Sequence, residues 1–359
     1  MTFFVPVLPA AQLTDAHSHH VLAIVVTFPS EVFPGESKAA NVSDHAFEQA
    51  CHCSGVPRCC CGTFGACSYS TIFIRISLFQ SGGCPSVVLR YYGCGSESEF
   101  GGSNTAAGTT RKTTSVFGQG NRQYLLQLPS NYNAGATYPV LFAFGGAEHT
   151  AERTKNYMRF SETAGNEAII VYPEGRGAVW EGPSYARTSR GEDVDFVRSI
   201  LSDLRSQYNV DNSRIYAAGL SNGGGMALSL ACQAPDVFSA VASVAGAYYN
   251  PVISGCSAGN VNTLIVHGTS DNHMKYAGGY GTGGSYYSVE DTWRDVADRN
   301  GCNLYSVAVS NSGRSDIRSF NGCDRGGKSV LQRVNGAGHT WFTENPNATR
   351  TVWNFLRDN

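Results

Sequence analysis

The chain has 359 residues and a formal net charge of −2 at pH 7, and only 15% of its residues are charged. This charge balance lacks the basic footprint of a protein that binds nucleic acid or an anionic membrane surface. The longest apolar runs, such as residues 21–28, are too short to span a bilayer, so we expect a globular monomer with no nucleic-acid or membrane partner.

Residues 1–93 show no sustained strand or helix period, and they contain a crowded group of cysteines (Cys51, Cys53, Cys59, Cys60, Cys61 and Cys67). A metal knuckle or a small disulfide module is one interpretation, but the spacing matches no pair of CxxC knuckles. We therefore interpret residues 1–93 as an N-terminal extension that is disordered or absent from the mature protein.

From residue 94 onward the sequence becomes regular after a lead-in rich in Gly, Ser and Thr. Apolar runs predict strands at 123–128, 139–144, 168–172, 214–218, 240–244, 262–267 and 330–334. Segments of helical period predict helices at 192–208, 224–234, 289–300 and 348–357. This alternation is typical of an α/β fold, a mostly parallel sheet with helices on both faces, and residues 94–359 are predicted to form one such domain.

Twelve cysteines and two N-glycosylation sequons, at Asn41 and Asn347, favour an oxidising secretory route. Residues 3–11 are apolar and end in small side chains, as in a signal peptide, although no Lys or Arg precedes them. We predict a secreted, extracellular protein with glycosylation at Asn347.

Residues 219–223 read Gly-Leu-Ser-Asn-Gly and lie between a predicted strand and a predicted helix. Glycines on both sides of Ser221 allow the tight strand-to-helix turn that exposes a nucleophilic hydroxyl. The pentapeptide alone is a weak signal in a chain with 41 glycines, and its flanking elements strengthen it. Ser221 is the predicted nucleophile.

A serine nucleophile needs a base and an acid that orients the base, and these can follow the serine in the order acid, then histidine. Asp271 lies in the loop after the predicted strand 262–267, where open α/β sheets build their sites. His339 lies in a glycine-rich loop between the last predicted strand and the final helix, whereas His267 ends a buried strand and is interpreted as structural. Asp271 and His339 are therefore the predicted acid and base.

The oxyanion formed on attack requires two backbone N–H donors. The N–H of Asn222, which follows the nucleophile, is one predicted donor. The other is expected from the loop after the second predicted strand, where Gly145, Gly146 or Ala147 could supply it, and Gly146 is our candidate.

These segments together resemble carbohydrate esterase family 1, in particular secreted fungal feruloyl esterases and polyhydroxybutyrate depolymerase-like esterases. The resembling motifs are GLSNGGGMA at 219–227, VHGTSD at 266–271 and GHTW at 338–341, with supporting matches at 171–175, 191–196 and 230–232. The resemblance covers residues 94–359. It implies an alpha/beta-hydrolase fold, a triad of Ser221, Asp271 and His339, and a reaction without metal or other cofactor.

The resemblance also bears on the cysteines of this region. It implies a local disulfide between Cys302 and Cys323, and Cys232 and Cys256 make a second pair. Cys94 is then left over, with Cys84 or another cysteine as its partner.

The predicted function is hydrolysis of feruloyl (hydroxycinnamoyl) esters on plant cell-wall polysaccharide such as arabinoxylan. Trp180 and Trp341 are candidates for an apolar slot that binds the aromatic acyl group, with ordinary core packing as the alternative. An acetylxylan esterase or a short-chain polyhydroxybutyrate depolymerase with the same triad is the alternative enzyme. A catalytically silent, glycan-binding hydrolase-fold domain is the alternative outside enzymes.

Overall fold

The computed structural model describes residues 21–27, 71–81, 84–94 and 108–359. The chain divides into two compact units, Met1–Ser103 and Asn104–Asn359. In the first unit, the described strands β1 (Val21–Thr27), β2 (Thr71–Ser81) and β3 (Cys84–Cys94) pair in antiparallel fashion in that order. The cysteine group at 51–67, the sequon at Asn41 and the apolar segment 3–11 lie outside the described residues, and the place of residues 1–93 in the mature protein stays a prediction.

A ten-stranded sheet forms the centre of the second unit, in the order β13-β14-β15-β10-β9-β8-β6-β7-β5-β4. Its strands are β4 (Thr109–Val116), β5 (Gly120–Gln127), β6 (Tyr138–Phe144), β7 (Ile169–Pro173), β8 (Val210–Leu220), β9 (Ala240–Val244), β10 (Asn262–Gly268), β13 (Asn303–Ser312), β14 (Ser315–Asn321) and β15 (Ser329–Val334). The six strands from β15 to β7 run parallel to their neighbours, and the strands at each edge are antiparallel. The sheet is therefore mostly parallel, as predicted.

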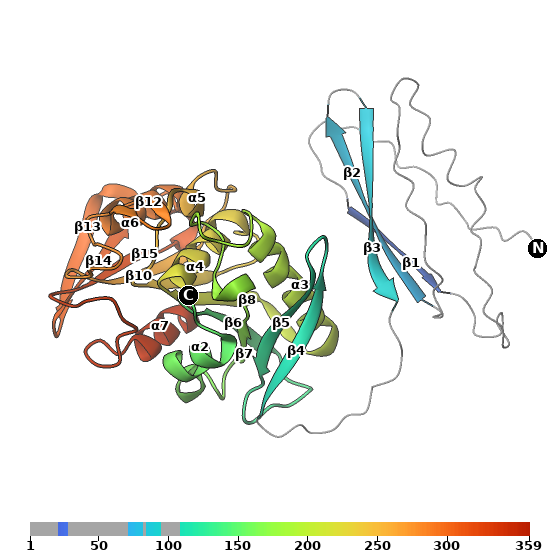
Figure 1. Ribbon diagram of the computed structural model, residues 1–359, viewed down its shortest axis with the longest axis horizontal. Helices are drawn as coiled ribbons and strands as arrows, with labels where there is room; N and C mark the ends of the chain where they lie inside the picture. The colour runs from blue at the N-terminus through green and yellow to red at the C-terminus, as the bar shows by residue number, and fades with distance from the viewer. Residues whose placement is uncertain (1–20, 28–70, 82–83, 95–107) are drawn as a thin grey trace, which may run out of the picture. The chain divides into compact units, whose positions relative to one another are not determined.

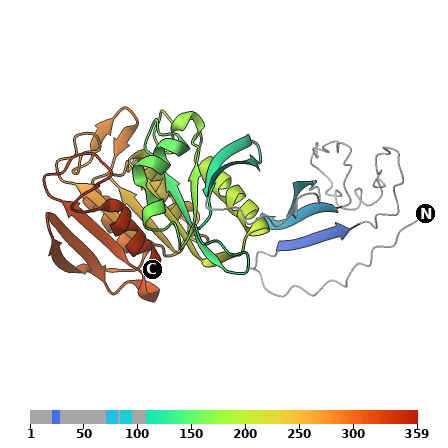
Figure 2. The ribbon, with the colours of Figure 1, turned by 90° about the horizontal axis from the view of Figure 1, so that it is seen from below.

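Helices cover both faces of this sheet, as Figure 1 shows. They are α2 (Ala151–Met158), α3 (Glu192–Gln207), α4 (Asn222–Gln233), α5 (Asn250–Ile253), α6 (Val289–Arg299) and α7 (Ala348–Arg357). Residues of α3, α4 and α6 share one buried apolar cluster, and residues of α2 and α7 share the other. The view in Figure 2 shows the same layers from a perpendicular direction.

The alternation of side chains along β6 explains how one strand serves both faces. Val140, Phe142 and Phe144 belong to the cluster on the side of α3 and α4, whereas Leu141 and Ala143 belong to the other. All five side chains are fully buried. Such burial on both faces is typical of a central parallel strand and explains its continuous apolar sequence.

The predicted strands and helices are all present, with ends that differ by a few residues. In the second unit the sequence prediction missed α2, α5, β4, β13 and β14, and in the first unit it missed β1, β2 and β3. The edge strands β4 and β13 expose many of their side chains, and α2 buries only Ala151, Thr154 and Met158, so none of them carries a strong apolar pattern. The small hairpin β11 (Gly279–Gly281) and β12 (Gly284–Tyr286) was also missed.

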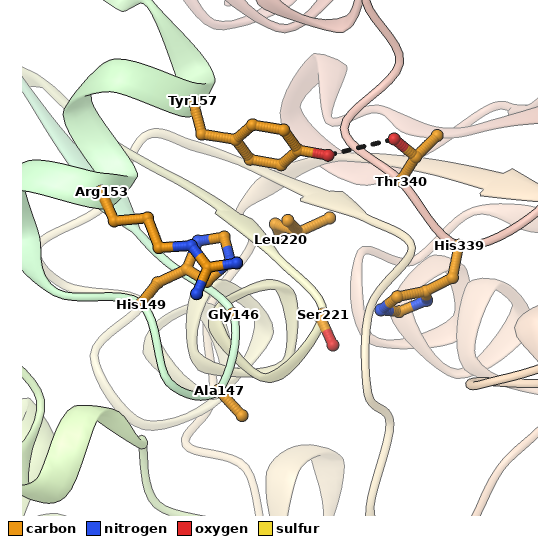
Figure 3. A pocket seen from close by; sticks show the side chains of 9 residues that line it. All are labelled: Gly146, Ala147, His149, Arg153, Tyr157, Leu220, Ser221, His339 and Thr340. Carbon is orange, nitrogen blue, oxygen red and sulfur yellow. Dashed lines mark hydrogen bonds between the residues drawn. The ribbon is translucent and has the colours of Figure 1, made fainter.

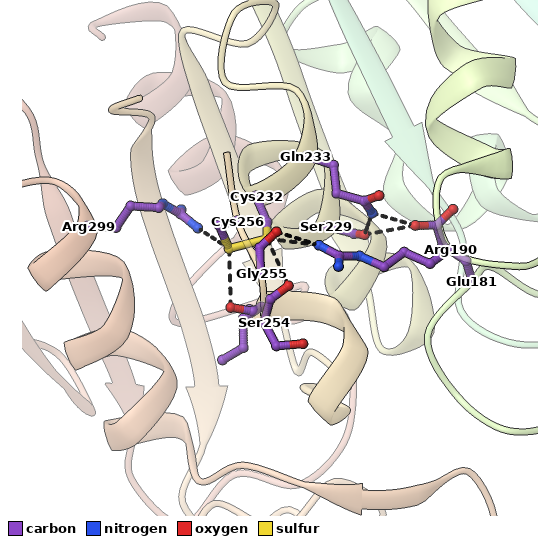
Figure 4. Close-up of a disulfide and its surroundings, with 10 residues drawn as sticks. Glu181, Arg190, Ser229, Cys232, Gln233, Ser254, Gly255, Cys256 and Arg299 are labelled. Carbon is purple, nitrogen blue, oxygen red and sulfur yellow. Dashed lines mark hydrogen bonds between the residues drawn. A yellow bond between two sulfur atoms is a disulfide. The ribbon is translucent and has the colours of Figure 1, made fainter. Parts of the chain in front are cut away.

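Two disulfides join the implied pairs of cysteines, Cys232 with Cys256 and Cys302 with Cys323. The first links the end of α4 to the segment after α5, and Figure 4 shows two guanidinium groups reaching it from opposite sides. Arg190 Nη2 lies 3.8 Å from Cys232 Sγ, and Arg299 Nη1 lies 3.3 Å from Cys256 Sγ. The side chains of the strands before residue 95 lie outside the description, so the partner of Cys94 stays open.

Candidate active site

Ser221 stands alone between the end of β8 and the start of α4, at φ 54° and ψ −120°. A positive φ is strained for a serine, and strain of this kind persists only where the surroundings fix the backbone. Ser221 N–H donates to Val244 O at 3.0 Å, and Ser221 O accepts from the N–H groups of Gly225 and Ala247 at 3.0 and 2.9 Å. These bonds hold the sharp turn that the sequence predicts.

The glycines on either side of the serine are required by close backbone contacts. A Cβ atom on Gly219 would lie 2.0 Å from Gly223 O, and one on Gly223 would lie 2.2 Å from Phe144 O. Both distances are far below van der Waals contact, and backbone atoms cannot rotate away. The GxSxG pattern thus reflects the packing of α4 against β8 and the end of β6.

Asp271 lies in the loop after β10, with its side chain fully buried. Its Oδ1 accepts the backbone N–H groups of His273 and Met274 at 2.9 and 2.8 Å, and its Oδ2 lies 2.7 Å from His339 Nδ1. Burial alone would raise the pKa of Asp271, but hydrogen bonds from His267, His339 and Met274 hold that pKa well below its usual range. The side chain is therefore an ionised acceptor.

His267 contributes a contact that the sequence did not predict. Its ring is buried as expected, and its Nε2 lies 2.8 Å from Met274 O and 3.3 Å from Asp271 Oδ2. Because both oxygens can only accept, Nε2 carries the proton and is shared between them. The structural histidine thus also contacts the predicted acid.

The contact with Asp271 fixes the tautomer of His339. The ionised carboxylate can only accept, so His339 Nδ1 carries the proton and Nε2 keeps its lone pair. His339 and Ser221 line the same cavity of about 340 Å³ and lie near each other in Figure 3. Among the described contacts, no hydrogen bond joins the two side chains. Such bonds are often long in an enzyme without substrate.

The two predicted oxyanion segments both lie beside Ser221. Asn222 begins α4, so its N–H points out of the first turn of that helix, and Gly146 lines the cavity. A Cβ atom placed on Gly146 would lie 3.4 Å from Ser221 Cβ, so the loop after β6 passes directly over the serine. Within residues 108–359, neither N–H donates to a described acceptor, which leaves both for an oxyanion.

The structure corrects the interpretation of Trp180 as part of a substrate slot. Its side chain is 1% exposed, packs edge-on against Phe144, and does not line the cavity. Its indole Nε1 donates to Gly145 O at 2.9 Å, and its backbone N–H donates to Asn222 Oδ1 at 2.7 Å. Trp180 therefore holds the two segments that carry the oxyanion candidates.

Trp341 is likewise a core residue and does not line the cavity. It packs against Phe160, and its Nε1 donates to Thr349 Oγ1 at 3.0 Å. The core-packing alternative is therefore the correct one for both tryptophans, because each indole is enclosed by side chains of the sheet and its covering helices.

A buried ionic network supports the segment that follows Trp180. Glu181 Oε2 accepts the N–H groups of Gly191 and Asp193 at the start of α3, and Asp193 Oδ2 accepts Glu181 N–H at 2.7 Å. Asp193 also forms an ion pair of 2.7 Å with Arg122. Burial raises the pKa of Glu181, although its hydrogen bonds oppose this rise. The network ties the segment to α3 and β5.

The sequence prediction missed one wall of the cavity, formed by His149, Arg153 and Tyr157 from α2 and the turn before it. Arg153 and Tyr157 are four residues apart and so lie on one face of α2, which was the available signal. Tyr157 OH lies 3.1 Å from Thr340 Oγ1, the residue after His339 (Figure 3). This contact joins α2 to the loop of the predicted base.

Asn347 is exposed and caps α7 by accepting the N–H of Arg350 at 2.9 Å. In the described part of the chain, no group of three or more His, Cys, Asp or Glu side chains is arranged to hold a metal ion. No helix in that same part has the length and hydrophobicity needed to cross a bilayer.

The fold and site define a member of the alpha/beta-hydrolase class, with the strained serine between a central strand and its helix. The solved structure of an acetyl xylan esterase from Aspergillus awamori shares this fold, with a TM-score of 0.51 and 16% identity over 68% of this chain and 98% of that one.

The Esterase family model matches residues 115–300, just over half of the chain, and the chain belongs to this family. Feruloyl esterase D of Neurospora crassa is 29% identical over 269 residues, 68% of this chain and 84% of that protein. Feruloyl esterase C of Emericella nidulans is 29% identical over 212 residues, 56% of this chain and 71% of that protein. The resemblance to carbohydrate esterase family 1 is confirmed, and the protein is a carboxylic ester hydrolase of the serine esterase type.

Proposed function

We propose that this protein is a secreted esterase that hydrolyses feruloyl (hydroxycinnamoyl) esters on plant cell-wall polysaccharide through a triad of Ser221, His339 and Asp271. The observation that carries the proposal is the 2.7 Å contact between Asp271 Oδ2 and His339 Nδ1 beside a cavity that also contains Ser221. The similarity to feruloyl esterases supports the choice of ester. The two disulfides support an oxidising compartment.

In the first half of the reaction, His339 Nε2 takes the proton of Ser221 Oγ while this oxygen attacks the ester carbonyl carbon. The negative oxygen of the tetrahedral intermediate accepts hydrogen bonds from the N–H groups of Asn222 and Gly146. The bond to the sugar oxygen then breaks, and His339 Nε2 gives its proton to that oxygen. An acyl-enzyme on Ser221 and a free sugar hydroxyl result.

In the second half, water replaces the sugar alcohol. His339 Nε2 takes a proton from water as its oxygen attacks the acyl carbon, and the second intermediate collapses with return of the proton to Ser221 Oγ. Free ferulic acid leaves and the enzyme is restored. Asp271 stays ionised throughout and stabilises the imidazolium form of His339.

The cavity offers both apolar and polar surface for such a substrate. Leu220 and the ring of Tyr157 line it and can contact an aromatic acyl group, and the cavity opens to solvent for the polysaccharide. We further propose that residues 94–359 form the catalytic unit and that residues 1–93 take no part in the reaction.

The test compares methyl ferulate, acetylated xylan and a polyhydroxybutyrate oligomer as substrates of the wild-type protein and of Ser221→Ala. We expect turnover of methyl ferulate that Ser221→Ala abolishes. Equal turnover by both proteins would refute the serine mechanism, and activity on acetyl esters alone would refute the feruloyl assignment. Ser202→Ala is a matched control, because Ser202 is exposed on α3 and does not line the cavity.

A further inference from the structure

One wall of the active-site cavity carries a positive charge that the ester hydrolysis described above does not use. This wall is formed by His149, Arg153 and Tyr157, and it faces the cavity that contains Ser221 and His339 (Figure 3). An ester carbonyl and its leaving alcohol are neutral groups and give a fixed cation nothing to pair with. The positive charge on this wall therefore indicates that the substrate carries a further group that pairs with it.

Arg153 extends from the first turn of α2 and is exposed. Among the residues that the structure describes, its guanidinium has no carboxylate within ion-pair distance and no hydrogen bond. Its neighbour Glu152 pairs with Arg111 instead. Because the guanidinium makes no described ion pair or hydrogen bond, binding an anion would break no such contact.

His149 adds a polar group next to this cation. The ring is half-buried, its Nδ1 is buried without a hydrogen-bond partner among the described residues, and the ring lies edge-on to Tyr157. Burial and the neighbouring Arg153 lower the pKa of His149, so the ring is neutral at pH 7 and can donate one hydrogen bond. Because Nδ1 is shielded from solvent, the hydrogen bond to a ligand in the cavity comes from Nε2.

Two residues of the wall, His149 and Tyr157, are held relative to the nucleophile. His149 N–H donates to Gly146 O at 3.1 Å, and a Cβ atom on Gly145 would lie 2.6 Å from His149 Cβ, so the histidine packs directly on the predicted oxyanion loop. Tyr157 OH contacts Thr340 on the other side of the cavity. A ligand group that contacts His149 would thus be held at a set position from the ester carbonyl.

Within the described residues, no Asp or Glu lines the cavity to neutralise this charge. Asp271 is buried behind His339 with both oxygens hydrogen-bonded, and Glu174 Oε2 accepts the N–H of Ala151 at the start of α2. Arg153 therefore brings its charge to the cavity with no carboxylate among the lining residues, which favours a negatively charged group.

We propose that Arg153 and His149 form a subsite for a carboxylate of the substrate, so that the enzyme prefers esters carrying an acidic group near the scissile bond, such as esters beside a uronic acid of a polysaccharide. The inference rests on the proposed function, since it concerns the substrate of the same serine. Arg153 pairs with the carboxylate, and His149 donates a hydrogen bond to it. The carboxylate can belong to the acyl group or to the alcohol.

Two pairs of isosteric esters test this subsite and distinguish the two sources. On the alcohol side, carboxymethyl ferulate is compared with carbamoylmethyl ferulate. On the acyl side, methyl 4-carboxycinnamate is compared with methyl 4-carbamoylcinnamate, in which the rigid ring keeps the carboxylate from attacking its own ester. In each pair the members differ only in having a carboxylate or a neutral amide, so the ratio of their kcat/KM values reports the charge preference.

We expect the wild-type enzyme to prefer the carboxylate member of one pair by about tenfold in kcat/KM, a ratio that one charge-assisted contact in a partly exposed site supplies. Arg153→Gln should bring this ratio close to one, and Arg153→Lys should retain part of it. Lys155→Gln removes the same charge from the same helix but outside the cavity, and it should keep the wild-type ratio.

A ratio near one for both pairs in the wild type, or a preference that survives Arg153→Gln, would overturn the subsite. Loss of the preference in Lys155→Gln as well would also overturn it, because the effect would then come from general charge. These outcomes differ from failure of the proposed function, in which neither member of the ferulate pair is hydrolysed, or Ser221→Ala hydrolyses both.

Discussion

Replacing Asp271 by Asn tests the predicted acid most directly, because the surrounding donors dictate how an amide must sit. Oδ1 of Asp271 accepts two backbone N–H groups, from His273 and Met274, at 2.9 and 2.8 Å. An NH₂ group cannot occupy that position, since it would face two donors. The NH₂ of the new side chain must therefore take the place of Oδ2, which lies 2.7 Å from His339 Nδ1 and 3.3 Å from His267 Nε2. His267 can keep its bond to Met274 O and His339 can change tautomer, whereas the two backbone donors at Oδ1 cannot change.

That orientation reverses the hydrogen bond to the base. The amide donates to His339 Nδ1, so this nitrogen must lose its proton and Nε2 must carry it instead. A protonated Nε2 cannot accept the proton of Ser221. We expect kcat to fall by about 10⁴-fold, or about 5.4 kcal/mol at 1.36 kcal/mol for each factor of ten.

The assay is steady-state hydrolysis of methyl ferulate, with circular dichroism and thermal unfolding to show that the variant is folded. Asp298→Asn is the control, because Asp298 is an exposed carboxylate of α6, and it should leave kcat unchanged. A loss of less than about tenfold in a folded Asp271→Asn protein would refute the orientation argument, because the difference in kcat expected from a wrong tautomer is far larger.

Three further predictions concern the support of the site. Trp180→Phe removes the hydrogen bond to Gly145 O. A buried carbonyl without a partner costs about 1–3 kcal/mol, so the loop that carries Gly146 should shift and kcat should fall several-fold. An unchanged kcat would show that the oxyanion loop keeps its position without this bond. Replacing both Cys232 and Cys256 by Ala should lower the free energy of unfolding by about 3 kcal/mol in urea titrations, whereas an unaltered midpoint would contradict a stabilising crosslink. Because the pKa of Asp271 is lower in the folded protein, its ionised carboxylate stabilises the fold at pH values above the unfolded pKa of about 3.9. This stability is lost as the pH falls from there towards the folded pKa. The wild type should therefore lose unfolding free energy more steeply with acid than Asp271→Asn, and equal slopes would argue against this shift.

The order of the site residues along the chain was accessible to sequence reasoning because each lies at a recognisable local boundary. Ser221 lies between a predicted strand and a predicted helix, and Asp271 lies just after a predicted strand. The glycines beside Ser221 reflect a steric need that any sequence with this turn must meet. Parallel strands bring their carboxyl ends to one edge of the sheet, so these separate loops were expected to meet.

The roles of Trp180 and Trp341 were not accessible, because an aromatic residue in a loop can face a cavity or the core with the same sequence around it. Only the tertiary contacts, Trp180 with Phe144 and Trp341 with Phe160, show that both side chains belong to the core. His267 is a similar case. Its burial followed from its strand, whereas its 3.3 Å contact with Asp271 depends on how the next loop folds back.

The sequence by itself determined the α/β class, the nucleophile turn and the order of the candidate triad, because these depend on local periodicity and on backbone sterics. The tertiary structure alone decided which side chains line the cavity. Arg153 and Tyr157 come from a short helix with little apolar pattern and His149 from the turn before it, and they reach the cavity only because that helix packs against the sheet beside Ser221. Contacts between distant segments are set by packing, and no local pattern records them.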